Sequence, residues 1–441
     1  MARPRKNAPK PNTQELSLVP VEEQPYSLPE DWKWVRLGSL ARTISKGTTP
    51  KGGKEAYLSS GVAFLRVENI HEDGTICHDN IAHVSIEQHL NFLKRSILEA
   101  GDILVSIAGT LGRTGIVREV DLPLNTNQAV SFVRLKNGIS NKYIRFFINS
   151  PIAQQLLLAQ TKVTSIPNLT LEIINNCSIP LPPLDEQERI VTRIESLFAK
   201  LDEAKEKTEA VLDSYETRKA AILHKAFTGE LTAKWREERG IEKESWKSLP
   251  FCALGSSKLG KMLDKQKNKG TPIPYLRNIN VRWFSFDLSE TAEMLATPEE
   301  VKLLSVKQGD LFICEGGEPG RCAVWKDEER PLIFQKALHR FRPNELASSD
   351  FLCFLLNYYA TSRKLDEFFT GTTIKHLTGQ SLAKIQVPVP TLPEQQEIIR
   401  ILDSLLEKEQ QSKEAAETVL EQIDLMKKAI LAKAFRGELD K

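Results

Sequence analysis

The sequence lacks any apolar run long enough to cross a bilayer, and its first residues contain no apolar signal region. We therefore expect no membrane segment and a cytoplasmic protein. Cysteine is scarce as well: the six cysteines are scattered, and no two of them form a CxxC pair. This spacing predicts reduced, mostly buried thiols and argues against a disulfide framework.

Catalytic patterns are missing too. The segment GTTPKGGK at 47–54 resembles a phosphate-binding loop, but five residues separate Gly47 from Gly53 and Glu55 stands where Ser or Thr must reach magnesium. The sequence has no Asn-Pro-Pro-aromatic or Asp-Pro-Pro-aromatic tetrapeptide, the pattern that amino-methyltransferases use around a flipped base. We predict no catalytic residue and no cofactor in this chain.

Potential metal ligands are present but follow no zinc template. They fall within nineteen residues and comprise His71, Cys77, His78, His83 and His89. Structural zinc sites need ligands paired at short, fixed spacings, so we interpret this cluster as a surface strand and turn and expect no metal site. The acidic pair Asp310 and Glu315 lacks the lysine expected of a nuclease centre.

The chain also lacks a strong excess of either charge. Its 60 Lys and Arg residues balance 58 Asp and Glu residues, which leaves a formal charge of +2. A free-standing nucleic-acid binder usually shows a larger basic excess, so charge alone does not predict DNA binding. Residues 1–29 combine four basic residues with prolines and polar residues, a composition that predicts a disordered tail.

What the sequence does contain is a long amphipathic stretch that occurs twice. From Asp185 to about Ala226, apolar residues recur at steps of four and three, the spacing of a coiled-coil helix. Adding 208 to each position gives a second stretch with the same rhythm. The positions that we expect to form the contact between the two helices are Ile190, Ile194, Leu197, Leu201, Val211, Tyr215, Ile222, Ile398, Leu402, Leu405, Val419, Ile423, Met426 and Ile430.

The two stretches begin and end alike. IPLPPLDEQERI at 179–190 corresponds to VPVPTLPEQQEI at 387–398, and AILHKAFTGEL at 221–231 corresponds to AILAKAFRGEL at 429–439. The prolines end the preceding elements, and the glycines suit helix C-caps. A helix of about 40 residues is roughly 60 Å long, so the segment between the repeats connects neighbouring ends only if the helices pair antiparallel.

Two similar globular segments accompany the helices. Each begins with short β-rich runs and ends with a helical pattern, which at 141–160 closes the first segment. GDLFICEGGEPGRCAV at 309–324 matches GDILVSIAGTLGRTGI at 101–116. The β-rich runs of the first segment are 62–70, 101–109 and 129–135.

The repeat predicts a mixed α/β (α+β) protein with an approximate two-fold axis. An antiparallel coiled coil would hold the two similar globules at the ends of a rod. A scaffold whose globules bind proteins is equally compatible with the repeat. The predicted segments are a tail at 1–29, a globule at 30–180, a helical region at 181–235, a second globule at 236–386 and a second helical region at 387–441.

The repeated residues resemble a known family. LDEQERIVTRIESLFAKLD after a proline-rich start, the exit KAFTGELTAKWREE and its second copy KAFRGELDK are similar to the conserved helical regions of type I restriction-modification specificity subunits. GTTPKGG and SIPNLTLEIINNCSIPLP resemble the target recognition domains of that family. The resemblance covers Pro29 to Lys441 and leaves the tail outside.

The resemblance implies a DNA-binding subunit that does not catalyse. Each target recognition domain would read one half of a split, asymmetric site in double-stranded DNA, and the helices would fix the gap between the halves. The helices would also dock two modification (methyltransferase) subunits, which restriction (translocase-nuclease) subunits join. S-adenosylmethionine, ATP and Mg²⁺ would belong to those partners. A coiled-coil scaffold that binds proteins instead of DNA remains the alternative.

Candidate contacts come from side-chain chemistry alone, because base-reading residues differ between relatives. Arg, Lys, Asn and Gln match base edges, whereas Ser, Thr and backbone amides hold phosphates. In the first globule the candidates are Lys46, Thr48, Lys51, Lys54, Arg66, Asn69, Arg113, Asn127 and Gln128. In the second they are Lys258, Lys261, Lys265, Arg277, Asn280, Arg321, Gln335 and Lys336, with Lys267 and Lys269 extending a basic loop.

The basic loop from Lys258 to Lys269 is the strongest of these features, because its lysines face only Asp264 in the sequence. For any single candidate, an ordinary surface residue or a strand-end hydrogen bond is an equally good explanation. Arg113 and Arg321 also fit a role in capping a glycine turn.

Overall fold

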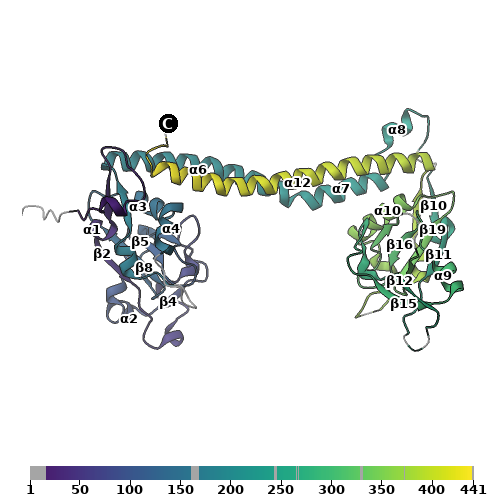
Figure 1. The fold of residues 1–441 in the computed structure, drawn as a ribbon, viewed down its shortest axis with the longest axis horizontal. Coiled ribbons are helices and arrows are strands. Elements are labelled where there is room, and N and C mark those ends of the chain that lie inside the picture. Colours follow the sequence, from purple (N-terminus) through teal and green to yellow (C-terminus); the bar gives the residue numbers. More distant parts are fainter. Residues whose placement is uncertain are drawn as a thin grey trace, which may run out of the picture. The chain divides into compact units, whose positions relative to one another are not determined.

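The computed structural model describes residues 16–159, 168–242, 246–264, 266, 268–327, 331–371 and 373–439. The chain forms two compact units (Figure 1): unit 1 spans Met1–Lys207 and Val419–Lys441, and unit 2 spans Thr208–Thr418. Lys265 and Lys267 lie outside the described residues, and nothing is described of the Lys54 side chain. No helix in the described ranges is long and apolar enough to cross a membrane.

Unit 1 is built around a four-stranded antiparallel sheet in the order β2-β8-β5-β6. Every residue of β5 is buried, as expected for a strand that begins with three apolar residues. A three-stranded sheet in the order β4-β3-β7 shares a hydrophobic cluster with it, to which Leu65, Leu104 and Phe132 contribute. The strands are β2 (Ala41–Lys46), β3 (Val62–Leu65), β4 (Ala82–Val84), β5 (Ile103–Ser106), β6 (Thr114–Ile116), β7 (Leu124–Thr126) and β8 (Val130–Leu135), and β1 (Lys33–Arg36) pairs with β9 (Ser178–Leu181).

The helical pattern at 141–160 forms two helices rather than the single one that we predicted. α3 (Asn141–Ile148) begins after Ser140, whose side chain caps it, and α4 starts at Pro151. A residue that precedes proline avoids the helical conformation, which explains the break at Ser150. The other helices of unit 1 are α1 (Leu37–Leu40), α2 (Ile86–Leu90), α4 (Pro151–Ala159), α5 (Leu171–Asn175) and the 3-10 turns Val21–Glu23, Gly53–Ala56, Val67–Asn69, Lys94–Ser96 and Glu119–Asp121.

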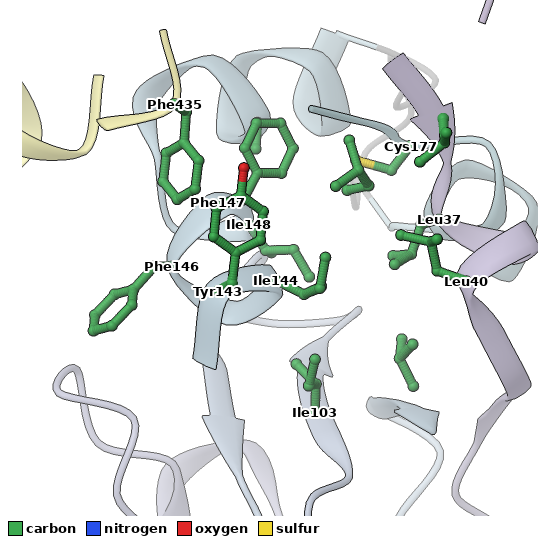
Figure 2. Close-up of a cluster of buried hydrophobic side chains, with 14 of the residues drawn as sticks. Leu37, Leu40, Ile103, Tyr143, Ile144, Phe146, Phe147, Ile148, Cys177 and Phe435 are labelled. Carbon is green, nitrogen blue, oxygen red and sulfur yellow. The ribbon is translucent and has the colours of Figure 1, made fainter. Parts of the chain in front are cut away.

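The phenylalanine of each copy of the KAF motif packs into the hydrophobic core of one unit. Phe435, from the second copy, packs against both Tyr143 and Phe147 at ring distances of 5.2 and 5.1 Å (Figure 2). In unit 2, Phe227 from the first copy packs against Phe351, the counterpart of Tyr143, at 5.5 Å. The end of the chain therefore returns to the first globule, as the antiparallel arrangement predicts.

Unit 2 repeats the topology of unit 1. Its sheets have the orders β11-β19-β16-β17 and β15-β12-β18, with β12 and β18 parallel as β3 and β7 are. Its strands are β10 (Lys247–Pro250), β11 (Gly255–Leu259), β12 (Thr271–Leu276), β13 (Val281–Arg282), β14 (Ser285–Phe286), β15 (Ala292–Ala296), β16 (Leu311–Cys314), β17 (Cys322–Val324), β18 (Ile333–Phe334), β19 (Leu338–Pro343) and β20 (Gln386–Val389). Its shorter helices are α8 (Ala233–Glu237), α9 (Pro298–Leu304), α10 (Ser349–Thr361), α11 (Gly379–Lys384) and the 3-10 turns Phe251–Leu254, Asn278–Asn280 and Asp366–Phe368.

The first long helix is interrupted, contrary to our prediction of one helix from Asp185 to Ala226. α6 (Leu184–Asp213) ends before Ser214, and α7 (Tyr215–Phe227) follows. The Ser214 hydroxyl donates to the Ala210 carbonyl at 2.8 Å. The Ser214 amide also donates to this carbonyl, at 3.2 Å, so the hydroxyl shares its acceptor with the backbone ladder. The second copy, α12 (Leu392–Ala434), is continuous.

Helix pairing is antiparallel within each unit. In unit 1, α6 and α12 share a core cluster that contains Ile190 and Leu431, and further along α6 Asp202 pairs with Lys427. In unit 2, the Tyr215 hydroxyl donates to Gln410 at 3.0 Å. There, Arg218 also pairs with Glu409 at 2.7 Å. Residue numbers rise along one helix as they fall along the other, which confirms the predicted direction.

The predicted contact stripe is wrong at two positions of α12. Val419 and Met426 have 38% and 50% of their surface exposed, whereas Ile423 is buried. Lys427 occupies the place expected of Met426: its ammonium lies 5.3 Å from the Phe198 ring centroid. A long lysine stem covers apolar surface while its charged end finds a partner, so a search for apolar residues alone overlooks it.

Candidate nucleic-acid interface

A single glycine in each unit brings the candidate residues together. In unit 1, the Gly47 amide, directly after β2, donates to the Val130 carbonyl at 3.0 Å. A Cβ atom on Gly47 would lie 2.1 Å from the Asn127 carbonyl oxygen, so only glycine permits this approach. The Thr48 amide then donates to Thr126 at 3.1 Å, and the Asn127 amide donates to Leu65 at 3.2 Å.

Unit 2 has the same backbone frame. Gly260 follows β11 and donates to Leu338 at 3.1 Å, and its Cβ atom would lie 2.2 Å from the Gln335 carbonyl oxygen. Lys261 donates to Phe334 at 3.0 Å, as Thr48 does to Thr126. We call these two regions the strand-end clusters; they comprise residues 46–48, 66 and 127–129 in unit 1 and residues 259–261, 277 and 335–337 in unit 2.

Polar side chains cover the strand-end cluster of unit 1. Lys46, Lys51 and Gln128 are exposed. The Thr49 hydroxyl donates to Gln128 at 2.6 Å. These residues therefore offer ammonium and amide groups at one surface.

Two residues near this cluster were not among the predicted contacts. The Arg95 guanidinium donates to the Thr48 hydroxyl at 3.0 Å, and the Gln88 side chain bonds both to the amide and to the carbonyl of Lys51 at 3.0 and 3.1 Å. Gln88 lies in α2, and Arg95 lies in the 3-10 turn that follows it. No local sequence signal links this segment to residues 46–51, because the contact depends on tertiary folding.

A groove of about 540 Å³ opens beside the strand-end cluster of unit 2. Gln335 and Lys336 line it from the turn between β18 and β19, and His376 lines it from the loop before α11. Met262 and Leu263, with 58% and 47% of their surface exposed, add apolar groups. Amide, ammonium and apolar groups side by side are the chemistry with which proteins read base edges.

Asn69 and Asn280 serve the backbone rather than the surface. Both side chains are buried, and each accepts a hydrogen bond from the amide of an arginine three residues earlier, Arg66 at 3.0 Å or Arg277 at 2.9 Å. We therefore remove both asparagines from the candidate interface. The two arginines remain partly exposed, with guanidinium contacts to Glu68 and to the Glu290 carbonyl.

Arg113 and Arg321 are also engaged within their units. Arg113 donates to the Ile70 carbonyl at 3.0 Å, and Arg321 donates to the Asn278 carbonyl at 2.9 Å and pairs with Glu318. Both contacts tie the glycine turn to the neighbouring 3-10 turn. The structure thus supports the capping alternative for this pair.

The expectation that only Asp264 opposes the basic loop is wrong. The Lys261 side chain is 10% exposed and pairs with Glu300. The hydrogen bond from the Lys261 ammonium holds the pKa of the Glu300 carboxyl below its ordinary value. Lys258 and Lys269 remain exposed. The basic surface of unit 2 is therefore smaller than the sequence suggests.

The histidine cluster is not one site. His78 contacts Asp121 at 3.0 Å and His89 contacts Asn125 at 3.2 Å, and burial lowers the pKa of His89. Throughout the described part of the chain, no three His, Cys, Asp or Glu side chains come together in a way that would hold a metal ion.

Comparison with known families decides the assignment. The profile described as "Type I restriction modification DNA specificity domain" matches residues 29–213 and 254–422, which include both strand-end clusters. The chain belongs to this specificity family. Each match begins before one strand-end cluster and ends within the helices.

Relatives of the specificity family match to different extents. The EcoBI specificity subunit of Escherichia coli is 33% identical over 224 residues, but the alignment covers only 50% of this chain and 46% of that relative. The EcoKI specificity subunit of Escherichia coli strain K12 is 23% identical, with coverages of 93% and 90%. The MjaVIII specificity subunit of Methanocaldococcus jannaschii is 27% identical, with coverages of 93% and 94%.

Solved structures of the specificity family share the fold. The HsdS subunit from Thermoanaerobacter tengcongensis aligns with a TM-score of 0.66 at 21% identity, over 95% of this chain and all of that one. A chain from a study of complex assembly and conformational transition of the type I R-M system aligns with a TM-score of 0.69 at 20% identity, over 94% of this chain and all of that one. At these identities the likeness supports the fold and not individual contacts.

Two lysines of unit 2 should behave differently toward DNA. Lys258→Ala is expected to lower the salt dependence of binding to duplex DNA by about one unit of slope, because an exposed ammonium that neutralises a phosphate releases a counterion. Lys261→Ala combined with Glu300→Gln should leave the slope unchanged, since this double variant removes an ion pair that carries no net charge. Binding of the full chain across a salt series measures both slopes. Equal slopes for the two variants would contradict this assignment.

Proposed function

We propose that this chain is the DNA-sequence-recognition subunit of a type I restriction-modification complex. In this proposal it binds a split, asymmetric site in double-stranded DNA, with one half-site for each unit. It does not catalyse; modification and restriction subunits that dock on it supply S-adenosylmethionine, ATP and Mg²⁺ chemistry. Because its substrate is genomic DNA, we place the complex in the cytoplasm.

The observation that supports this proposal best is one backbone frame with two sets of side chains. Gly47 and Gly260 occupy equivalent places with equivalent hydrogen bonds, yet the residue that follows is Thr48 in one unit and Lys261 in the other. The 127–128 pair is Asn-Gln, and the 335–336 pair is Gln-Lys. Equal frames with different donors and acceptors are suited to two half-sites of unequal sequence.

The proposed DNA contacts are the partly or fully accessible candidates other than Arg113, Lys261 and Arg321, whose side chains are engaged within their units, together with two candidates whose side chains are not described. In unit 1 they are Lys46, Thr48, Lys51, Lys54, Arg66, Asn127 and Gln128. In unit 2 they are Lys258, Lys265, Arg277, Gln335 and Lys336.

The helices are proposed to dock the modification subunits. On α12, Val419 and Met426 are 38% and 50% exposed, and their spacing of seven residues places them on one face of the helix. An apolar strip on a charged helix is suited to a partner protein, since burying it against a partner removes apolar surface from water. It therefore supports docking through α12.

Genome-wide methylation sequencing tests the proposal. Cells that express the modification subunits of the system are compared with and without this chain. A split, asymmetric methylated motif should appear only when the chain is present. Methylation that persists without the chain, or an active modification subunit that gives no split motif with it, would favour the scaffold alternative.

A further inference from the structure

One acidic side chain stands among the proposed DNA contacts of unit 2. Glu315 follows β16 and lines the groove together with Gln335, Lys336 and His376. Its side chain is partly exposed. Within the described ranges its carboxylate makes no hydrogen bond and no ion pair.

The fold does not need a carboxylate at this position. The Glu315 amide donates to Ala337 at 2.9 Å, and the Glu315 carbonyl accepts from Leu377 at 2.7 Å. In unit 1, Ile107 stands at the equivalent position and makes the equivalent two backbone bonds at 2.8 and 3.0 Å. The Ile107 side chain is 6% exposed, so the same frame accommodates an apolar residue.

The turn opposite Glu315 is held in a strained conformation. Ala337 has a φ of 92°, in the left-handed region that side chains other than glycine rarely adopt. This conformation presents Gln335 and Lys336 at the edge of the groove. Strain of this kind is retained where the surrounding structure fixes a functional geometry.

A carboxylate in a surface that binds DNA is repelled by phosphates, so it contributes to binding only by accepting hydrogen bonds. In the major groove the donors are the exocyclic amino groups of cytosine and adenine. Guanine and thymine present carbonyl oxygens at the corresponding edge, and a carboxylate repels these. Glu315 is therefore suited to select between the two kinds of base.

We propose that Glu315 is a specificity-determining residue of unit 2, which accepts a hydrogen bond from the exocyclic amino group of a cytosine or adenine in one half-site. This assignment rests on the proposed function, because it requires unit 2 to read DNA. Selection by one such contact amounts to roughly ten- to hundredfold at one position of the site.

The test compares methylated motifs made by the complete complex carrying wild-type chain, Glu315→Gln, Glu315→Ile or Glu345→Gln. Glutamine can donate to a carbonyl oxygen, so Glu315→Gln should admit guanine or thymine at one position of one half-site. Glu315→Ile, which installs the residue of unit 1, should remove the selection there by roughly ten- to hundredfold. Glu345 is exposed beyond the far end of β19, so Glu345→Gln removes the same charge away from the groove and should leave the motif unchanged.

The outcomes distinguish failure of the proposed function from failure of the role of Glu315. If the wild-type chain directs no split motif, the proposed function is wrong. If it does, and Glu315→Gln and Glu315→Ile give its motif unaltered, only the role of Glu315 is wrong. Loss of all methylation in both variants, with the chain soluble and assembled, would show that Glu315 is needed for activity at every site rather than for selection at one position, and would also overturn its role in specificity.

Discussion

Replacing Glu394 with alanine is expected to lower the free energy of unfolding of unit 2 by about 3–5 kcal/mol. Glu394 is fully buried in the first turn of α12, and its carboxylate accepts hydrogen bonds from Arg236 at 2.5 Å, Thr232 at 2.8 Å and Trp246 at 3.0 Å. The alanine variant would leave the buried Arg236 and Thr232 donors, and the partly buried Trp246 indole N–H, without this acceptor. Removing one partner of a buried ion pair costs more than the pair contributes, because the remaining charge stays desolvated.

The sequence repeat supplies a matched control for this variant. Glu186 is the residue of α6 that corresponds to Glu394, but it is 28% exposed and pairs with Arg189, which is 58% exposed. Exposed pairs contribute about 0–1 kcal/mol, so Glu186→Ala should have little effect. Hydrogen exchange followed by mass spectrometry resolves the two units: protection should fall across 208–418 for Glu394→Ala and remain unchanged for Glu186→Ala.

A double variant separates the ion pair from the surrounding packing. Arg236→Met with Glu394→Leu removes both charges and keeps the volumes similar, so it should destabilise unit 2 less than Glu394→Ala alone. A double variant that is less stable than the single one would show that the ion pair itself, and not the unpaired charge, determines the loss.

The order of the helices followed from the sequence, but their details did not. The steps of four and three predicted Ile190, Ile194, Ile398 and Leu402 as contact residues, and all four are buried. The sequence did not predict the break at Ser214, because Thr192 and Thr418 bond to the carbonyl four residues earlier in the same way and their helices continue. The same apolar spacing also gave no reason to expect Lys427 at a contact position, because lysine is not an apolar residue.

In the candidate site, too, features within a short sequence motif could be predicted, whereas contacts between distant residues could not. Gly47 lies in the GTTPKGG motif and Gly260 in the basic loop from Lys258 to Lys269, and each permits the close backbone approach of its strand-end frame. The partner of Lys261 is Glu300, which lies in α9, 39 positions later in the sequence. Nothing in the local composition indicates that this acid neutralises the basic loop, since the contact forms only when α9 folds beside β11.

Asp310 and Glu315 are close in the sequence but do not form one site. Five positions apart, they resemble an acidic pair, but β16 lies between them, from Leu311 to Cys314. Asp310 is 1% exposed and pairs with Arg342 at one end of the strand, whereas Glu315 lines the groove at the other. Adjacent acids across a strand therefore have separate roles, one in stability and one, as we propose, in recognition.

Loss of Asp310 is expected to destabilise unit 2 by about 3–5 kcal/mol, more than loss of its counterpart Asp102 destabilises unit 1. Asp310 accepts two bonds from Arg342, at 2.6 and 3.0 Å, and lies 4.0 Å from the buried Arg340. Asp102 accepts two bonds from Arg134, at 2.9 and 2.8 Å. Each aspartate is 1% exposed, so the two sites differ in their cations. Arg342 is 35% and Arg134 18% exposed, but Arg340, which has no cationic counterpart in unit 1, is only 8% exposed.

Removing Asp310 leaves two cations near each other. Burial and the neighbouring Arg342 already lower the pKa of Arg340, and Asp310 opposes this effect. In unit 1, Arg134 retains an ion pair with Glu99 at 2.6 Å, and Phe132 stands at the position of Arg340. We therefore expect Asp102→Ala to cost about 1–3 kcal/mol, close to the cost of unsatisfied hydrogen bonds to one partly compensated group.

A third variant identifies the cause. Arg340→Phe installs the residue that unit 1 has at this position, so in the Asp310→Ala background it should recover part of the lost stability by removing the second buried cation. Denaturant unfolding of the full chain, with hydrogen exchange to assign each transition to its unit, measures all three variants. Equal losses for Asp310→Ala and Asp102→Ala, with no recovery from Arg340→Phe, would show that the bidentate pair alone governs stability and that Arg340 does not depend on Asp310.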